Sequence, residues 1–102
     1  MGNSQSVGIG KFELYTGKQL LKIGNEEIQL SQKENKLLTL FASHQNEMLE
    51  RDHLLKEIWE DEGVFVGRSL DMFVSKLRKK LIQDQNVQLK NIRGRGYVLQ
   101  VK

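Results

Sequence analysis

The chain lacks cysteine, and it lacks any long apolar run. Without cysteine it forms no disulfide and offers no thiolate to a metal ion. No apolar stretch approaches the roughly 18 residues that a membrane-spanning helix requires. The first eight residues, MGNSQSVG, have no charged start followed by an apolar stretch, which argues against a secretory signal. These absences predict a cytoplasmic protein, or an excised module of one, with no membrane partner.

Motifs for catalysis and for metal binding are also missing. The sequence has no Gly-rich phosphate-binding loop, no nucleophile elbow and no grouping of Ser, His and an acid. Its two histidines, His44 and His53, fall on different expected elements and share no ligand spacing. The sequence therefore predicts a protein that is not an enzyme and that uses no metal and no cofactor.

What is present is one small domain with an uneven charge distribution. Its 102 residues are 38% hydrophobic and 28% charged, which is typical of a globular domain. Residues 68–102 hold nine Lys and Arg against two Asp and Glu, whereas residues 1–67 hold seven against eleven. The two parts therefore carry net charges of +7 and −4 within an overall charge of +3. Such a basic C-terminal third indicates a polyanionic partner.

The N-terminal part predicts a small sheet. Residues 1–10 are interpreted as a linker remnant or an expression scar, so the domain is expected to occupy residues 11–102. Residues 11–30 alternate loosely between apolar and polar positions, with turn signals at Gly17 and Gly24. Alternation broken by such turns predicts three short antiparallel strands with one buried face.

Two helices are expected next. Ser31 with Glu34 three positions later forms a capping box in front of an apolar periodic run, which predicts a helix over about 32–43. A second apolar periodic run predicts a helix over about 51–59, with Trp59 as a core anchor.

A third helix is expected over residues 68–84. At about 100° per residue, its apolar residues cluster within roughly 40° of one another and must face the core. This buried stripe consists of Leu70, Val74, Leu77 and Leu81. The opposite face consists of Arg68, Met72, Ser75, Lys76 and Lys79. Phe73 is expected at the edge of the core side and Arg78 at the other edge.

A β-hairpin is expected at the C-terminus. Alternating strands over about 87–92 and 97–101 flank the sequence Arg-Gly-Arg-Gly at 93–96, whose glycines allow the positive φ angles of a tight turn. A basic helix face alone is usually a solvated surface, and basic hairpin tips are common. Adjacent to each other, and carrying nearly all the net positive charge, the two favour a polyanion that has a groove for the helix and a backbone for the hairpin. Duplex DNA fits that description.

The order of these elements and three stretches of sequence carry a family resemblance. The stretches are LSQKENKLLTLFASHQNEMLERDHLLKEIW at 30–59, GRSLDMFVSKLRKKL at 67–81 and NIRGRGYVL at 91–99. Over roughly 11–102 the chain resembles the C-terminal effector domain of OmpR/PhoB-type response regulators. The resemblance implies an α+β fold, a winged helix-turn-helix with a short N-terminal antiparallel sheet, three helices and a C-terminal β-hairpin wing.

The resemblance also implies roles for individual residues. The residues that match base contacts in the major groove are Met72, Ser75, Lys76 and Lys79. The residues that match phosphate contacts are Arg68, Ser69, Arg78, Asn91, Arg95 and Tyr97. Arg93 matches the wing position that enters the minor groove. The residues that match a loop in contact with RNA polymerase are Glu60, Asp61, Glu62, Val64 and Phe65.

The whole resemblance implies sequence-specific binding of double-stranded DNA as the output of a phosphorelay, a two-component regulatory system that controls transcription. Such proteins carry an N-terminal receiver domain that a sensor histidine kinase phosphorylates, and no part of this sequence resembles one. The isolated domain is expected to be monomeric and to occupy direct-repeat half-sites. Two alternatives stay open. A winged helix used only as a protein-interaction module would have an apolar or mixed outer helix face, and an RNA-binding domain would expose aromatic residues on a sheet.

Overall fold

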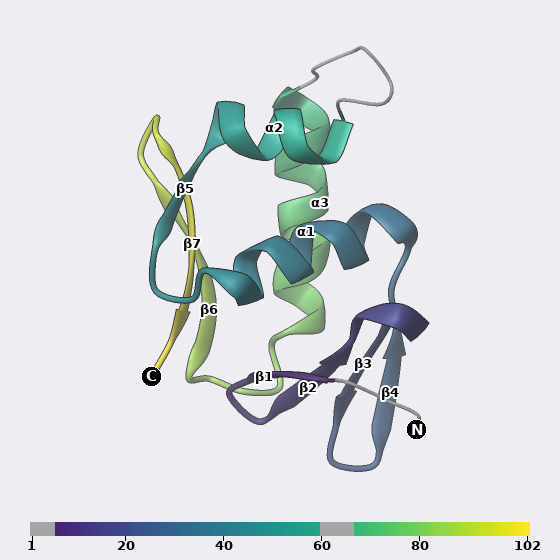
Figure 1. The fold of residues 1–102 in the computed structure, drawn as a ribbon. Helices are drawn as coiled ribbons and strands as arrows, with labels where there is room; N and C mark the ends of the chain where they lie inside the picture. Colours follow the sequence, from purple (N-terminus) through teal and green to yellow (C-terminus); the bar gives the residue numbers. More distant parts are fainter. Residues whose placement is uncertain (1–5, 60–66) are drawn as a thin grey trace.

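The structure is a computed structural model that describes residues 6–59 and 67–102, with the backbone alone for residues 67–69. An N-terminal sheet, helices α1, α2 and α3, and a C-terminal sheet surround one hydrophobic core (Figure 1). The element order agrees with the predicted α+β arrangement of a small sheet, helices and a terminal hairpin.

The N-terminal sheet is a four-stranded antiparallel meander in chain order. Its strands are β1 (Val7–Ile9), β2 (Phe12–Tyr15), β3 (Leu20–Ile23) and β4 (Glu26–Gln29), with the short helix η1 (Thr16–Lys18) between β2 and β3. The predicted three strands over 11–30 are confirmed. Setting residues 7–9 aside as part of a linker remnant was wrong, because Ile9 is fully buried and pairs with Phe12. Three residues are too few to show an alternation, so pairing and packing alone define β1.

The turn after β1 rests on the segment that follows α3 (Gly67–Lys80). Gly10 has a φ of +59°, and a Cβ built on it would lie 2.6 Å from the Asp84 carboxylate. The backbone N–H of Lys11 donates to that carboxylate at 2.8 Å, and the N–H of Asn86 does so at 3.0 Å. The prediction that the third helix reaches residue 84 was therefore wrong, since the helix ends at Lys80. Asp84 is a buried acceptor for loop N–H groups, which compete with helical hydrogen bonding.

Helices α1 (Gln32–Ser43) and α2 (Arg51–Trp59) have the predicted bounds. The capping box of α1 is present in both directions. The N–H of Glu34 donates to Ser31 Oγ at 3.2 Å, and the N–H of Ser31 donates to Glu34 Oε1 at 2.8 Å. These bonds satisfy N–H groups that a helix start otherwise leaves without partners.

The C-terminal sheet contains β5 (Met48–Glu50), β7 (Gly96–Val101) and β6 (Val87–Ile92) in that spatial order. The predicted hairpin of β6 and β7 is confirmed, and the N–H of Arg95 closes its turn on the carbonyl of Ile92 at 2.8 Å. Gly94 has the expected positive φ, at +68°, but Gly96 does not. Gly96 is required for another reason, because a Cβ there would lie 2.0 Å from the carbonyl oxygen of Leu49.

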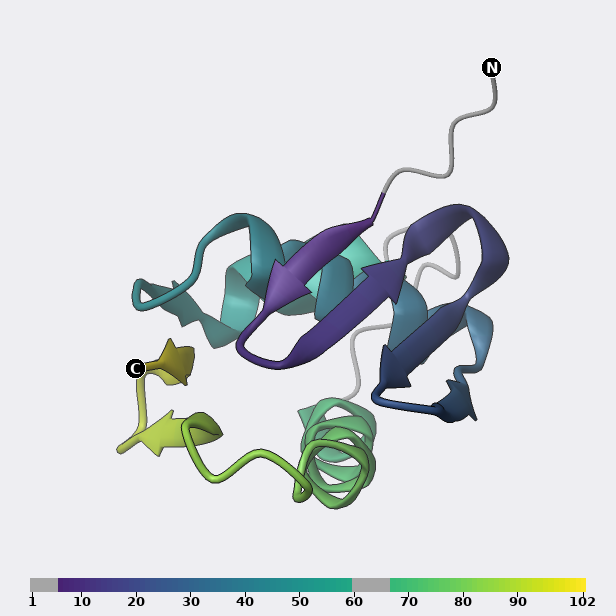
Figure 2. The same ribbon diagram turned by 90° about the horizontal axis from the view of Figure 1, so that it is seen from below.

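Helix α3 lies between the two sheets with one face turned inward. Seen nearly end-on in Figure 2, it has the hairpin on one side and the N-terminal sheet on another. The predicted buried stripe is confirmed, since each of its residues is at most 2% exposed: Leu70, Val74, Leu77 and Leu81. Burial of this stripe leaves the opposite face of α3 on the surface of the molecule.

Candidate nucleic-acid interface

The outer face of α3 gathers the residues predicted to contact bases. Met72, Ser75, Lys76 and Lys79 are all exposed, and 48% of Met72 is accessible. They lie opposite the buried stripe because an α-helix turns by about 100° per residue. The structure thus brings these four residues together on one surface, which we call the α3 outer face.

Two groups of predicted site residues lie outside the described part of the chain. One is the pair of side chains at the start of α3, Arg68 and Ser69. The other is the predicted RNA polymerase-contact loop with Glu60, Asp61, Glu62, Val64 and Phe65.

Two aromatic rings, those of Trp59 and Phe73, pack between the core and the α3 outer face. Trp59 is buried, as predicted for a core anchor, and its ring centroid lies 5.8 Å from that of Phe73. Phe73 is partly buried at the edge of the core, also as predicted. The Lys76 ammonium lies 5.1 Å from the Phe73 ring centroid, and the Lys33 ammonium lies 5.7 Å from that of Trp59. Such cation–aromatic contacts favour a particular placement of a long side chain, so Phe73 links the position of Lys76 to the core.

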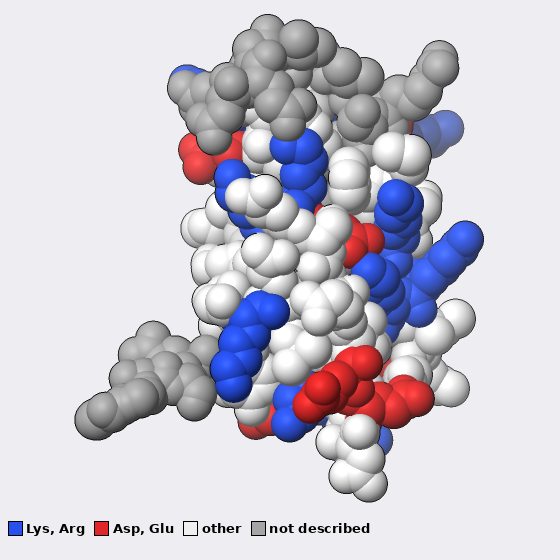
Figure 3. Space-filling view, turned by 90° about the vertical axis from the view of Figure 1, so that its right-hand side faces the viewer, with Lys and Arg blue, Asp and Glu red and all other residues white. Residues whose placement is uncertain are grey.

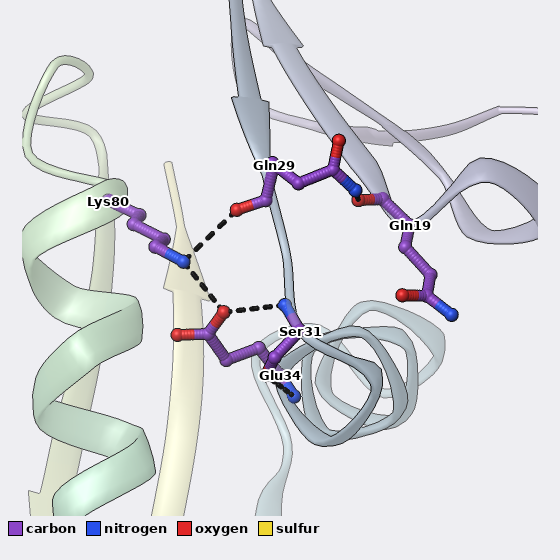
Figure 4. A network of polar contacts seen from close by, with 5 residues as sticks. All are labelled: Gln19, Gln29, Ser31, Glu34 and Lys80. Atoms are coloured by element: carbon purple, nitrogen blue, oxygen red, sulfur yellow. Dashed lines mark hydrogen bonds and ion pairs between the residues drawn. The ribbon is translucent and has the colours of Figure 1, made fainter.

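Lys80 follows Lys79 in sequence but points to a different environment (Figure 4). Its ammonium lies 2.6 Å from Glu34 Oε1 and donates to the carbonyl of Gln29 at 3.2 Å. Burial raises the pKa of Glu34, but hydrogen bonds from Lys80 and Ser31 and the charge of Lys80 outweigh it, so this pKa is lowered overall. Lys80 therefore joins the C-terminal end of α3 to the start of α1.

The hairpin turn presents its two arginines on an open tip. Arg93 and Arg95 are exposed, and a Cβ built on Gly94 between them would meet no atom within 4 Å. Asn91, a predicted phosphate contact, is exposed on β6 and faces Tyr97 across the hairpin. The structure thus brings Arg93, Arg95 and Asn91 together at one end of the C-terminal sheet.

Arg78 occupies the boundary between α3 and β6. Its Nε donates to the carbonyl of Leu89 at 2.8 Å. This bond orients the guanidinium and uses one of its five N–H donors. The predicted phosphate contact of Arg78 is compatible with this arrangement, because the bond to Leu89 uses the Nε–H and leaves the four Nη–H donors for other acceptors.

Tyr97, in contrast, is buried and has its hydroxyl committed within the protein. The residue is only 4% exposed, and its hydroxyl donates to Asp71 Oδ1. Arg51 Nη1 donates to the same oxygen at 2.7 Å, so Asp71 joins α2, α3 and β7. A phosphate requires a donor, and the single O–H of Tyr97 already has an acceptor.

The pKa shifts agree with this geometry. Hydrogen bonds from Arg51 and Tyr97 lower the pKa of Asp71, while burial and then the bond to Asp71 raise the pKa of Tyr97. Sequence reasoning did not single out Asp71 or Arg51. The available signal was an acidic residue on an otherwise basic helix.

Positive charge dominates the surface around α3. Most Lys and Arg residues of the C-terminal third are exposed, namely Lys76, Arg78, Lys79, Lys90, Arg93, Arg95 and Lys102. In Figure 3 blue side chains gather along the edge where α3 lies, and a group of red ones lies at the lower end, at the N-terminal sheet. Within the described residues, the basic C-terminal third thus contributes a largely basic surface along α3 and the hairpin.

Residues 6–59 and 67–102 contain no candidate for a metal site or for a membrane span. In these ranges no group of three or more His, Cys, Asp and Glu is arranged to hold a metal ion. No helix among the described elements has the length and apolarity needed to cross a membrane.

A basic helix on the surface, beside a basic hairpin and packed on two preceding helices, defines the winged helix-turn-helix class, so the predicted fold is confirmed. Residues 25–99 match the family described as "Transcriptional regulatory protein, C terminal", and the chain belongs to this family. This confirms the resemblance to OmpR/PhoB-type effector domains.

Similar proteins carry corresponding descriptions. The chain is 47% identical over 91 residues to the transcriptional regulatory protein RprY of Bacteroides fragilis, an alignment that covers 89% of this chain and 39% of that protein. The DNA-binding domain of Escherichia coli CadC superposes with a TM-score of 0.86 at 25% identity, covering 98% of this chain and 96% of that one. The Klebsiella pneumoniae RstA DNA-binding domain, solved in complex with the RstA box, has a TM-score of 0.77 at 28% identity, with 94% and 97% covered. The chain spans about two fifths of the length of the curated relatives it matches.

Proposed function

We propose that this domain binds double-stranded DNA sequence-specifically, as the output domain of a two-component response regulator that controls transcription. Helix α3 lies in the major groove, and the wing, the turn of β6 and β7 at residues 92–96, lies over the adjacent minor groove. The observation that carries this proposal is the α3 outer face, which exposes two lysines opposite a fully buried stripe and lies beside the wing arginines.

Each part of this interface has a task that its chemistry suits. Met72, Ser75, Lys76 and Lys79 face base edges, where lysine is a good donor to guanine acceptors. Arg78, Asn91 and Arg95 contact phosphates, and Arg93 enters the minor groove, together with phosphate contacts from Arg68 and Ser69. Tyr97 is omitted from the phosphate contacts because its O–H group is bonded to Asp71.

The alternative, a winged helix that binds only proteins, is less well supported. A protein-docking helix would expose an apolar stripe, whereas the described part of α3 exposes one large apolar side chain, Met72. RNA binding through stacked bases would require aromatic residues exposed on a sheet. Tyr97, the aromatic residue of the described hairpin, is buried.

The wider role of the protein is part of the proposal. We expect a receiver domain, phosphorylated by a sensor histidine kinase, elsewhere in the protein and contact of residues 60–65 with RNA polymerase. We also expect a cytoplasmic location, and an isolated domain that is monomeric and occupies direct-repeat half-sites about 10–10.5 bp apart. The description of RprY as a transcriptional regulatory protein supports the regulatory role, and the solved complex of the RstA domain with the RstA box supports duplex binding.

Selection of bound sites from random duplex DNA, followed by titration at several salt concentrations, tests the proposal. Neutralising about four phosphates predicts a log–log salt slope near −3.6, at about −0.9 per phosphate. Enrichment of one motif with a steep slope supports the proposal. A slope near zero, or equal affinity for duplex and single strands, would overturn it.

A further inference from the structure

Asp71 is the one acidic residue in the basic helix α3. Residues 68–80 of α3 contain five Lys and Arg but this single acid, and its side chain is 53% exposed. A carboxylate on a helix that meets phosphates opposes binding through charge repulsion. The role of the Asp71 carboxylate must therefore differ from electrostatic attraction to DNA.

The contacts of Asp71 join the recognition helix to the wing. Its Oδ1 accepts from Arg51 Nη1 at 2.7 Å and from the Tyr97 hydroxyl. Tyr97 directly follows the wing turn, and the backbone N–H of Arg51 donates to the carbonyl of Arg95 within that turn at 3.0 Å. Arg51 also lies 6.0 Å from the Tyr97 ring centroid. Tyr97 of β7 is thus connected to the Asp71 carboxylate directly. Arg95 in the wing turn is connected to it through Arg51.

A second connection between α3 and the hairpin lies further from the tip. Arg78 donates to the carbonyl of Leu89, three residues before the turn begins at Ile92. Pairing with β5 also holds the hairpin, whereas the bonds of Asp71 and Arg78 connect it to α3 itself at two points. Of these two, the Asp71 connection lies nearer to Arg93 and Arg95, so it is the one suited to set where the tip lies relative to α3.

We propose that Asp71 is a positioning residue that sets the angle of the wing relative to α3, so that minor-groove contact by Arg93 depends on major-groove placement of α3. This inference rests on the proposed function. Helix α3 and the wing then contact the two grooves as one rigid unit. The domain prefers a flanking sequence with a narrow minor groove only when Asp71 fixes the angle of the wing.

The test measures how much Arg93 contributes in different backgrounds. Fluorescence anisotropy is recorded with two duplexes that share the selected half-site and differ in an A·T-rich or G·C-rich flank. The loss caused by Arg93→Ala is determined in the wild type and in Asp71→Ala, Asp71→Asn and Tyr97→Phe. The Ala and Asn variants both remove the charge, but only Asn keeps an oxygen that accepts from Arg51 and Tyr97. Tyr15→Phe is the matched control, because it removes a hydroxyl bonded to Glu13 on β2 at 3.1 Å.

In the wild type, Tyr15→Phe and Asp71→Asn, we expect Arg93→Ala to cause a larger loss on the A·T-rich flank. In the Asp71→Ala and Tyr97→Phe backgrounds, the ratio between the affinity loss on the A·T-rich flank and the loss on the G·C-rich flank should fall roughly two- to tenfold. Such a fall is expected for residues that are coupled through shared contacts. An unchanged loss in all backgrounds, or equal changes in Asp71→Ala and Asp71→Asn, would overturn the inference and leave duplex binding intact. No duplex binding by the wild type would overturn the proposed function and this inference with it.

Discussion

Lys79 and Lys80 are adjacent residues of one type on α3, and we predict that their replacement has opposite consequences. The Lys80 ammonium lies 2.6 Å from Glu34 Oε1, whereas Lys79 is exposed on the α3 outer face. Lys80→Met should lower the free energy of unfolding by about 1–3 kcal/mol, the cost of removing a donor from a buried acceptor. The cost stays below that of breaking a fully buried pair because Glu34 keeps its bond from the Ser31 N–H. Lys79→Met should change the free energy of unfolding by less than about 0.5 kcal/mol.

Thermal unfolding followed by circular dichroism distinguishes the two variants. In a small domain 1 kcal/mol corresponds to about 4–8 °C in melting temperature, so Lys80→Met should melt visibly earlier than the wild type. Anisotropy with duplex DNA should give the reverse order, because Lys79→Met removes a proposed base contact and Lys80→Met does not. Equal melting temperatures for the two variants would refute the assigned role of Lys80.

The pH dependence provides an independent check on this contact. The pKa of Glu34 is lowered from its ordinary value of 4.5 in the folded protein. A group with a lowered folded pKa stabilises the protein above its unfolded pKa, and this contribution is lost as the pH falls through the folded value. The difference in stability between the wild type and Lys80→Met should therefore narrow once the pH falls below 4.5. A difference that stays constant as the pH falls well below 4.5 would contradict the carboxylate's role.

Three further predictions concern the interface and the hairpin. Lys76→Ala should lose about 1–3 kcal/mol on the best site and relax preference at one or two base pairs; equal weakening on all sequences in a binding-site selection would make Lys76 a phosphate contact. Arg93→Ala should lose more affinity on A·T-rich than on G·C-rich flanks with little change in melting temperature, and Arg93→Lys should restore only part of the loss, because a guanidinium is less strongly hydrated than an ammonium. A flank-independent loss would make Arg93 a general backbone contact. Gly96→Ala should destabilise the domain by about 1–3 kcal/mol through overpacking, since its Cβ would lie 2.0 Å from the Leu49 carbonyl oxygen; Gly8→Ala, whose Cβ has no atom within 4 Å, is the control for thermal unfolding.

Local signals in the sequence were sufficient for most of the secondary structure. The capping box and the apolar period predicted the bounds of α1 because both act within one turn of helix. The inward face of α3 followed from the angle between successive residues. The hairpin followed from alternating strands around a turn that needs a positive φ at Gly94.

Elements defined by distant contacts could not be predicted in the same way. β1 exists because Ile9 packs in the core and pairs with β2, which three residues of sequence do not reveal. Helix α3 ends at Lys80, and the Asp84 carboxylate beyond it accepts an N–H from Lys11, which is 73 residues away in the chain. Gly96 avoids a side chain because β5 passes close to it, and no turn rule contains that requirement.

The sequence by itself predicted a polyanionic partner and determined which face of α3 lies on the surface. Charge distribution and helical period are properties of the order of residues, so the basic C-terminal third and the α3 outer face follow from that order alone. Tertiary structure decided what each polar side chain does within that framework. It paired Lys80 with Glu34, and it bonded the Tyr97 hydroxyl and Arg51 to Asp71. These roles depend on distances between segments remote in sequence, and only the packed core brings those segments within hydrogen-bonding range.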